Sequence, residues 1–152
     1  MNQENVQKLT DRLRRLCSRR EYCRYDIIKK AMTALEGDRE AAEAVLEVLV
    51  SEKYVDDLRY ASAYAREKAM ISGWGETKIR YMLSAKRIER ALIDEALTEI
   101  DEVKADSRLR KVLENKAKTL KADPQIRLKL LRFALGRGYQ YDDVVRVLQD
   151  IL

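Results

Sequence analysis

Histidine is absent from this sequence of 152 residues, which also holds only one proline and five glycines. Without histidine there is no Ser-His or Cys-His nucleophile and no imidazole base, so the commonest hydrolytic sites are excluded. Few prolines and glycines disfavour a turn-rich β-protein and favour helices with short connections. We therefore predict a chain without strands.

Long apolar runs are also missing. No stretch approaches the roughly 20 apolar residues that cross a bilayer, and the first residues lack the basic start and apolar segment of a signal peptide. Apolar residues nevertheless make up 46% of the sequence and recur throughout it, which is typical of a folded chain. We expect a cytoplasmic protein that does not bind membranes.

Metal ligands and cofactor motifs are scarce. Cys17 and Cys23 are the two cysteines, and without histidine they make a poor zinc site, so two free thiols are expected in a reducing compartment. The acidic pairs at 56–57 and 142–143 could hold Mg²⁺, but charged helix starts are the better interpretation. We predict no cofactor, no metal and no catalytic residue, which leaves an enzyme as a distant alternative.

A repeated apolar pattern is what the sequence does contain. Three stripes with the helical spacing i, i+3, i+4, i+7 follow one another at intervals of 51 residues. They are Ala42, Val45, Leu46 and Leu49, then Ile93, Ala96, Leu97 and Ile100, then Val144, Val147, Leu148 and Ile151. In the preceding helices, the same interval matches Ile28, Ala31 and Met32 with Ile79, Met82 and Leu83, and these with Leu130, Phe133 and Ala134.

A further helix is expected before each pair, near residues 5–18, 57–71 and 105–121. The prediction is an all-α fold of three tandem three-helix repeats, at 1–54, 55–103 and 104–152, stacked into an elongated, curved body. We expect Asp56 and Asp57 to cap the helix at 57 or to place negative charge at its start, and Pro124 to lie in a helix's first turn. The chain is expected to be a monomer.

Charge is distributed in bands. Residues 8–30 carry nine Lys/Arg against three Asp/Glu, residues 36–57 carry two against eight, and residues 104–137 carry eleven against three. Basic bands suit a phosphate backbone or an acidic protein surface. The acidic band argues against simple wrapping in nucleic acid, so a partner with both signs of charge, such as a protein–DNA complex, fits better.

Basic residues on and around the second helix of each unit are the candidate partner and DNA contacts. Individually, such residues more often just keep a helix soluble, and tyrosines more often fill helix seams than stack on bases. The candidates are Arg19, Arg20, Arg24, Lys29, Lys30, Lys78, Arg80, Lys86, Arg87, Arg127, Lys129, Arg132 and Arg137. The interleaved tyrosines are Tyr22, Tyr25, Tyr81, Tyr139 and Tyr141.

Four segments resemble one bacterial family. They are Arg19-Arg20-Glu21-Tyr22, the double-acid segment with Tyr54, Asp56, Asp57, Arg59 and Tyr60, the turn Gly73-Trp74-Gly75, and the late turn Arg137-Gly138-Tyr139. With these segments the chain, from about residue 8 to residue 151, resembles the RecX family of regulators of the RecA recombinase. Two positions depart from the family pattern: Arg87 stands where glycine is usual, and Cys23 stands where a serine usually caps a helix.

The resemblance implies three repeats of three helices and a protein without catalysis or cofactor. It also implies binding in the groove of a RecA–DNA filament, with inhibition of ATP hydrolysis, filament growth and strand exchange as the usual effect. Single- or double-stranded DNA would be bound weakly by the chain alone. Two alternatives remain, a free-standing helical DNA-binding protein and a helical-repeat scaffold that binds only proteins.

Overall fold

The computed structural model describes residues 2–100 and 102–152. This part of the chain holds nine α-helices, one 3-10 helix and no strand, as predicted. The helices are α1 (Gln3–Arg19), α2 (Arg24–Ala34), α3 (Arg39–Ser51), α4 (Asp57–Met70), α5 (Glu76–Ala85), α6 (Arg90–Leu97), α7 (Glu102–Ala117), η1 (Lys118–Leu120), α8 (Ile126–Gly136) and α9 (Tyr141–Ile151). Among these described helices, none is long and apolar enough to cross a membrane.

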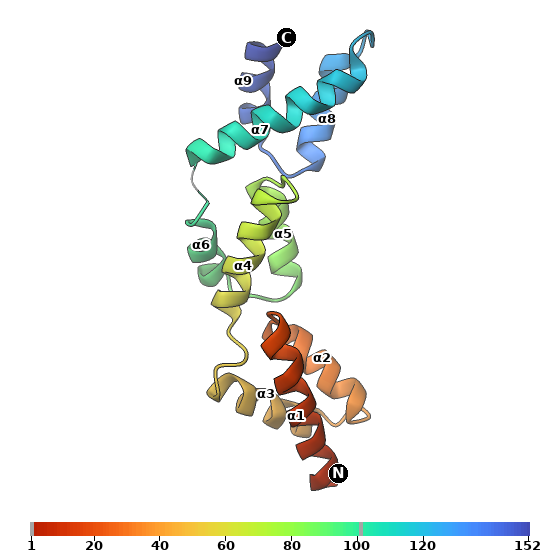
Figure 1. Cartoon of the computed structure of the whole chain (residues 1–152), viewed down its shortest axis with the longest axis vertical. Helices are drawn as coiled ribbons and strands as arrows, with labels where there is room; N and C mark the ends of the chain where they lie inside the picture. The colour runs from red at the N-terminus through yellow and green to blue at the C-terminus, as the bar shows by residue number, and fades with distance from the viewer. Residues whose placement is uncertain (1, 101) are drawn as a thin grey trace.

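The helices form three groups of three that follow one another along a long axis (Figure 1). The second helices of the groups, α2, α5 and α8, lie along one edge of the body, and α3, α6 and α9 lie along the other (Figure 1). The first helices, α1, α4 and α7, lie between the two edges. The predicted elongated stack of three-helix units is thereby confirmed.

Each group surrounds a hydrophobic core of its own. The predicted stripe on each third helix faces this core: all four residues of the α3 stripe are buried, while Ile100 and Ile151, which end the other two stripes, are only partly buried. The prediction that Ile100 continues a helical stripe is wrong, because α6 ends at Leu97. The cores are not strictly separate, because Cys23 is buried with the second group. The unit boundaries 1–54, 55–103 and 104–152 therefore stay a prediction, and residue 101 within them lies outside the described part.

The second helices are offset by one residue from the predicted alignment in the first group. Ile27 and Ala31, both fully buried, take the positions expected for Ile28 and Met32. The connection after α2 contains two residues with left-handed backbone, Glu36 (φ 54°) and Gly37 (φ 85°). The corresponding connections contain one each, Arg87 (φ 57°) and Gly138 (φ 96°). The three connections nevertheless have the same length and equivalent hydrogen bonds, since the N–H groups of Gly37, Ile88 and Tyr139 each donate to the carbonyl five residues earlier. The offset therefore lies in which face of α2 is buried.

Aspartates begin several helices. The Asp56 side chain caps α4 by accepting a hydrogen bond of 3.0 Å from the Arg59 backbone N–H, as predicted. The prediction that Pro124 lies in the first turn of a helix is wrong, because α8 begins at Ile126. The backbone turns instead at Asp123, whose carbonyl accepts from the Ile126 N–H at 3.2 Å and whose side chain accepts from the Gln125 N–H at 2.8 Å.

One ion pair recurs in all three groups, between an arginine on the first helix and an acid at the end of the third. The pairs are Arg14–Glu52 at 2.5 Å, Arg66–Glu99 at 2.7 Å and Arg110–Asp150 at 2.8 Å. Since these pairs lie at the surface, their contribution to stability is small. Their recurrence reinforces the repeat that the apolar stripes predicted.

Candidate protein and nucleic-acid interface

The joint between the first two groups lies where α2 begins. Cys23 precedes α2 and makes no side-chain capping bond, which agrees with the expectation that it is a poor cap. Its side chain is fully buried against the second group. Asp57 supplies the missing acceptor, because its Oδ1 accepts a hydrogen bond of 2.8 Å from the backbone N–H of Arg24. Burial raises the pKa of Asp57, and the bond from Arg24 opposes that shift.

The joint between the second and third groups is built in a similar way, where α5 begins. The backbone N–H groups of Gly75 and Thr77 donate to the carbonyls of Arg137 and Gly138, at 2.8 and 3.0 Å. A Cβ atom on Gly75 would lie 2.5 Å from the Gly138 oxygen, and one on Gly138 would lie 2.3 Å from the Lys78 Cβ. In both joints, the following group accepts hydrogen bonds from backbone N–H groups that have no partner within their own helix, at the start of α2 or α5.

The segments that resemble the RecX pattern line these two joints. Arg59 bonds the Glu21 carboxylate at 2.6 Å and the Tyr54 carbonyl at 3.1 Å. At the second joint, Arg137 donates to the Ser72 carbonyl and the Tyr139 hydroxyl donates to the Gly73 carbonyl, both at 2.8 Å. These motif residues hold neighbouring groups together, and this role accounts for them without any contact to a partner.

Four of the predicted contact residues form ion pairs within the molecule. The pairs are Arg24–Glu47 at 2.9 Å, Arg80–Asp94 at 2.7 Å, Lys86–Asp26 at 2.6 Å and Lys129–Asp123. The Asp26 carboxylate raises the pKa of Lys86 by its hydrogen bond. A phosphate or an acidic protein surface would have to displace these acids, so these four cations are weaker candidates than the rest.

None of the nine remaining predicted contact residues pairs with an acid of residues 2–100 and 102–152. One of the nine, Arg137, bonds the Ser72 carbonyl at the second joint, which leaves eight. Seven of them are exposed, and Lys78 is half-buried. They are Arg19, Arg20, Lys29, Lys30, Lys78, Arg87, Arg127 and Arg132. These cations are available to a partner without loss of an internal ion pair.

The first joint gathers four of these cations around two tyrosines at the start of α2. Arg20 and Lys30 lie over the ring of Tyr22, and Lys29 and Arg87 lie over the ring of Tyr25. The distances to the ring centroids run from 4.9 Å for Arg20 to 5.4 Å for Arg87, which is within the range of cation–π attraction. Since Arg87 lies in the connection after α5, the second group completes this cluster.

Similar clusters occur in the other two groups. Lys78 and Lys68 lie 4.3 and 4.9 Å from the centroid of the Trp74 ring, and Lys116 and Arg137 lie 5.0 and 4.9 Å from that of Phe133. The sequence prediction missed Lys68, Lys116 and Phe133. No helical spacing joins Lys68 to Trp74 or Lys116 to Phe133, so only the tertiary structure reveals these contacts.

The predicted tyrosines differ in their availability for stacking. Tyr81 is 72% exposed and Tyr141 is 58% exposed, so both rings are open to a partner. Tyr139 is only 8% exposed and its hydroxyl is bonded at the second joint. Tyr139 therefore fills a seam between helices, which is the role that the sequence favoured for a single tyrosine, and burial raises the pKa of its hydroxyl.

Acidic side chains of the first group lie on α3, at the edge opposite α2 (Figure 1). Glu40, Glu43 and Glu47 are exposed there. The two bands of opposite charge are not fully separated in the first group, because Glu47 pairs with Arg24 of α2 at 2.9 Å and Glu52 pairs with Arg14 of α1 at 2.5 Å. A partner surface that bears both signs of charge could contact both edges.

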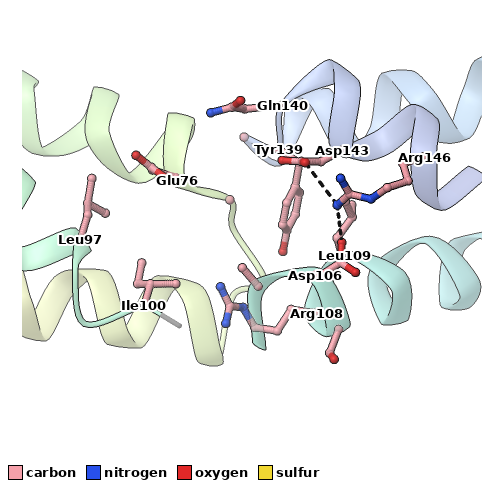
Figure 2. Close-up of a pocket in the computed structure, with 14 residues that line it drawn as sticks. Glu76, Leu97, Ile100, Asp106, Arg108, Leu109, Tyr139, Gln140, Asp143 and Arg146 are labelled. Carbon is pink, nitrogen blue, oxygen red and sulfur yellow. Dashed lines mark hydrogen bonds and ion pairs between the residues drawn. The ribbon is translucent and has the colours of Figure 1, made fainter. Parts of the chain in front are cut away.

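The second joint also contains a cleft of about 580 Å³ (Figure 2). Its charges are mixed and largely paired: Arg146 bonds Asp106 at 2.8 Å and lies 3.3 Å from Asp143. The cleft also contains Arg108, which faces Tyr139 (Figure 2). In the described part of the chain, no three potential metal ligands come together. Nothing in this cleft has the arrangement of a nucleophile with its base.

Comparisons with known proteins identify similar chains. Residues 56–97 match the model of the second three-helix domain of RecX, and residues 105–148 match that of the third. The chain is 36% identical to the regulatory protein RecX of Vibrio campbellii over 131 residues, covering 85% of this chain and 82% of that protein. It is 34% identical to RecX of Pseudomonas putida, covering 88% and 84%.

Some relatives are longer than this chain. A 32% identical RecX of Clostridium tetani is matched over 76% of this chain but only 54% of its own length. Among solved structures, RecX from Lactobacillus salivarius superposes with a TM-score of 0.83 at 19% identity, covering 97% of this chain and 96% of that one. A second RecX crystal structure gives 0.84 at 22% identity, covering 95% and 72%. At these sequence identities, the similarity to the two solved structures shows only a common fold.

Proposed function

This chain belongs to the RecX family of regulatory proteins, and from that premise we propose that it binds in the groove of a RecA–DNA filament. Its effect there is to inhibit ATP hydrolysis, filament extension and strand exchange. The chain does so without catalysis, because it acts by binding several RecA protomers of the filament and opposing their rearrangement.

The observation that carries this proposal is the arrangement of charge along the edge formed by α2, α5 and α8. Every group contributes one cluster of cations around aromatic rings, at Tyr22 and Tyr25, at Trp74 and at Phe133. A row of such clusters on one elongated body is suited to a long, repetitive, negatively charged partner. A filament that presents both phosphates and protein surface is such a partner.

The mechanism follows from the length of the body. A chain that contacts several neighbouring protomers at once stabilises one of their relative arrangements. It thereby opposes the conformational changes that hydrolysis and strand exchange require. The acidic edge at α3 meets basic protein surface in this arrangement, while the basic edge approaches phosphates or acidic protein surface.

DNA alone is a weaker ligand in this proposal. Cations attract phosphates without reading sequence, and the affinity falls as salt rises because counterions are released. The exposed rings of Tyr81 and Tyr141 add stacking surface for unpaired bases. Binding to bare DNA should therefore be weak, salt-sensitive and largely independent of sequence.

The test is RecA's single-stranded-DNA-dependent ATP hydrolysis, titrated with this protein at ratios far below one per RecA. RecA from the same organism is the appropriate partner. Inhibition well below one-to-one is the expected result, since one bound chain affects many protomers. No effect from folded protein would contradict the proposal. Tight binding to bare duplex would then favour a free-standing DNA-binding protein, and partner binding that survives nuclease treatment would favour a protein scaffold.

A further inference from the structure

A groove lies between α1 and α2 of the first group. Two adjoining hollows, of about 650 and 450 Å³, share Arg12 and Ala34 in their walls. We call their combined surface the α1–α2 groove. Arg12 and Arg15 line it and were not among the predicted contacts, whereas Lys29 and Lys30 belong both to the groove and to the cluster at the first joint.

The floor of the groove is apolar. Leu9, Leu13 and Leu16 follow α1 at the spacing i, i+4, i+7 and line the hollows from one side. Leu35 and Ala34 line them from the end of α2. Leu9 and Leu13 also belong to the first core, with 4% and 1% of their surface exposed, so they are fixed in place.

The walls of the groove are basic. Arg12 and Arg15 on α1 and Lys29 and Lys30 on α2 are exposed and pair with no acid in the described residues. The Asp11 carboxylate, which also lines the groove, is already bonded by Arg14 at 2.6 Å. Glu36 also lines the groove and forms no ion pair in the described residues. Four unpaired cations against this one unpaired carboxylate leave the groove positively charged.

We propose that the α1–α2 groove binds an acidic amphipathic helix of a partner protein. Apolar side chains of such a helix contact the leucine floor, and its acidic side chains pair with the cations of the two walls. Nucleic acid matches this surface less well, because a leucine floor offers nothing to phosphates and neither Tyr22 nor Tyr25 lines the hollows. This inference goes beyond the proposed filament binding and does not depend on it.

Direct binding measured by fluorescence anisotropy tests the proposal, with the full chain and no RecA present. The probe is a labelled synthetic peptide of about 18 residues, long enough for several helical turns, with leucines at i, i+3, i+4 and i+7 and glutamates elsewhere. A second peptide has the same composition with the leucines scrambled. Oligothymidylate is added as a competitor.

The amphipathic peptide should bind at least about tenfold more tightly than the scrambled one, because only its leucines share one face. The double variant Arg12→Glu, Arg15→Glu should weaken binding of the amphipathic peptide by about tenfold or more. Its matched control is Lys53→Glu, Arg90→Glu, which makes the same change of charge at exposed residues that follow α3 and begin α6. The control should alter binding by less than about twofold.

Three results would overturn the proposal. Equal affinity for both peptides would mean that net charge alone is recognised. Displacement of the peptide by oligothymidylate, with oligothymidylate itself losing affinity in the Arg12→Glu, Arg15→Glu variant, would make the groove a nucleic-acid site. Self-association of the chain that the peptide reverses would identify a second copy as the occupant. Both double variants are checked for parental helix content and midpoint of unfolding, so that loss of binding reports on the groove.

Discussion

The carboxylate of Asp57 accepts a hydrogen bond of 2.8 Å from the backbone N–H of Arg24, across the joint between the first two helical groups. The helix that receives this cap and the residue that provides it belong to different groups. Formation of α2 and docking of the second group are therefore coupled, because each stabilises the other.

Replacement of Asp57 by alanine should lower the free energy of unfolding by about 1 kcal/mol, the typical loss of a helix cap. Asp57→Asn should cost less, since an amide oxygen can still accept the bond. Urea titration measures the stability, and hydrogen exchange at the Arg24 amide localises the effect to the joint. The control is Asp56→Ala, which removes the cap of α4 and should leave exchange at Arg24 unchanged. Parental exchange at Arg24 in Asp57→Ala would contradict the proposed coupling.

Gly138 and Gly75 should not tolerate a side chain. A Cβ on Gly138 would lie 2.3 Å from the Lys78 Cβ, and the φ of Gly138 is +96°, a conformation that side chains disfavour. We expect Gly138→Ala to separate the second and third groups and to lower the midpoint of thermal unfolding by several degrees, measured by circular dichroism.

Gly136 provides the matched control for that substitution. It lies two residues earlier, at the end of α8, and a Cβ there would meet nothing within 4 Å. Gly136→Ala should be neutral or slightly stabilising, by up to about 1 kcal/mol. Equal losses in both variants would mean that flexibility after α8, and not the close contact of the joint, is what matters.

The pH dependence of stability should reveal the burial of Cys23. Burial raises the pKa of this thiol to about 12, above the value of about 8.5 expected in the unfolded chain. The folded state therefore holds the proton more tightly. The stability that this provides is complete below about pH 8.5 and decreases as the pH rises toward 12, by at most about 1.4 kcal/mol per pH unit.

Urea titrations between pH 8 and 10 measure this slope. The parent should lose stability relative to Cys23→Ala across that range, because alanine has no proton to release. Cys17 is common to both proteins, so its own raised pKa cancels in the comparison. Parallel pH profiles would show that Cys23 ionises as freely in the folded protein as in the unfolded one.

The sequence predicted the helices and their buried faces because both depend on the local period of 3.6 residues. It missed the one-residue offset of α2, because the spacing of apolar residues does not decide whether the face with Ile27 and Ala31 or the adjacent face with Ile28 and Met32 packs into the core. It identified Cys23 as a poor cap but not Asp57 as the substitute, because 33 residues separate Arg24 from its acceptor. Contacts between residues far apart in the sequence leave no local pattern from which they can be predicted. The cation–π contacts around Trp74 and Phe133 were missed for the same reason.

The prediction that tests the basic edge itself concerns α8. Arg127 and Arg132 are exposed and pair with no acid that the structure describes, whereas Lys129 is held by Asp123. Reversal of Arg127 and Arg132 to glutamate should therefore preserve the fold. It should weaken binding to the RecA–DNA filament by about tenfold or more, and if both contact phosphates it should lower the salt slope by about two.

The same measurement on Lys53→Glu, Arg90→Glu separates this local effect from net charge, because both variants change the total charge equally. Filament binding can be followed by the ATPase titration and by co-sedimentation at several salt concentrations. Parental affinity in the α8 variant would exclude the third group from the interface. A similar loss in both variants would mean that the filament attracts the chain through its overall charge, because long-range attraction does not depend on which edge carries the reversed residues.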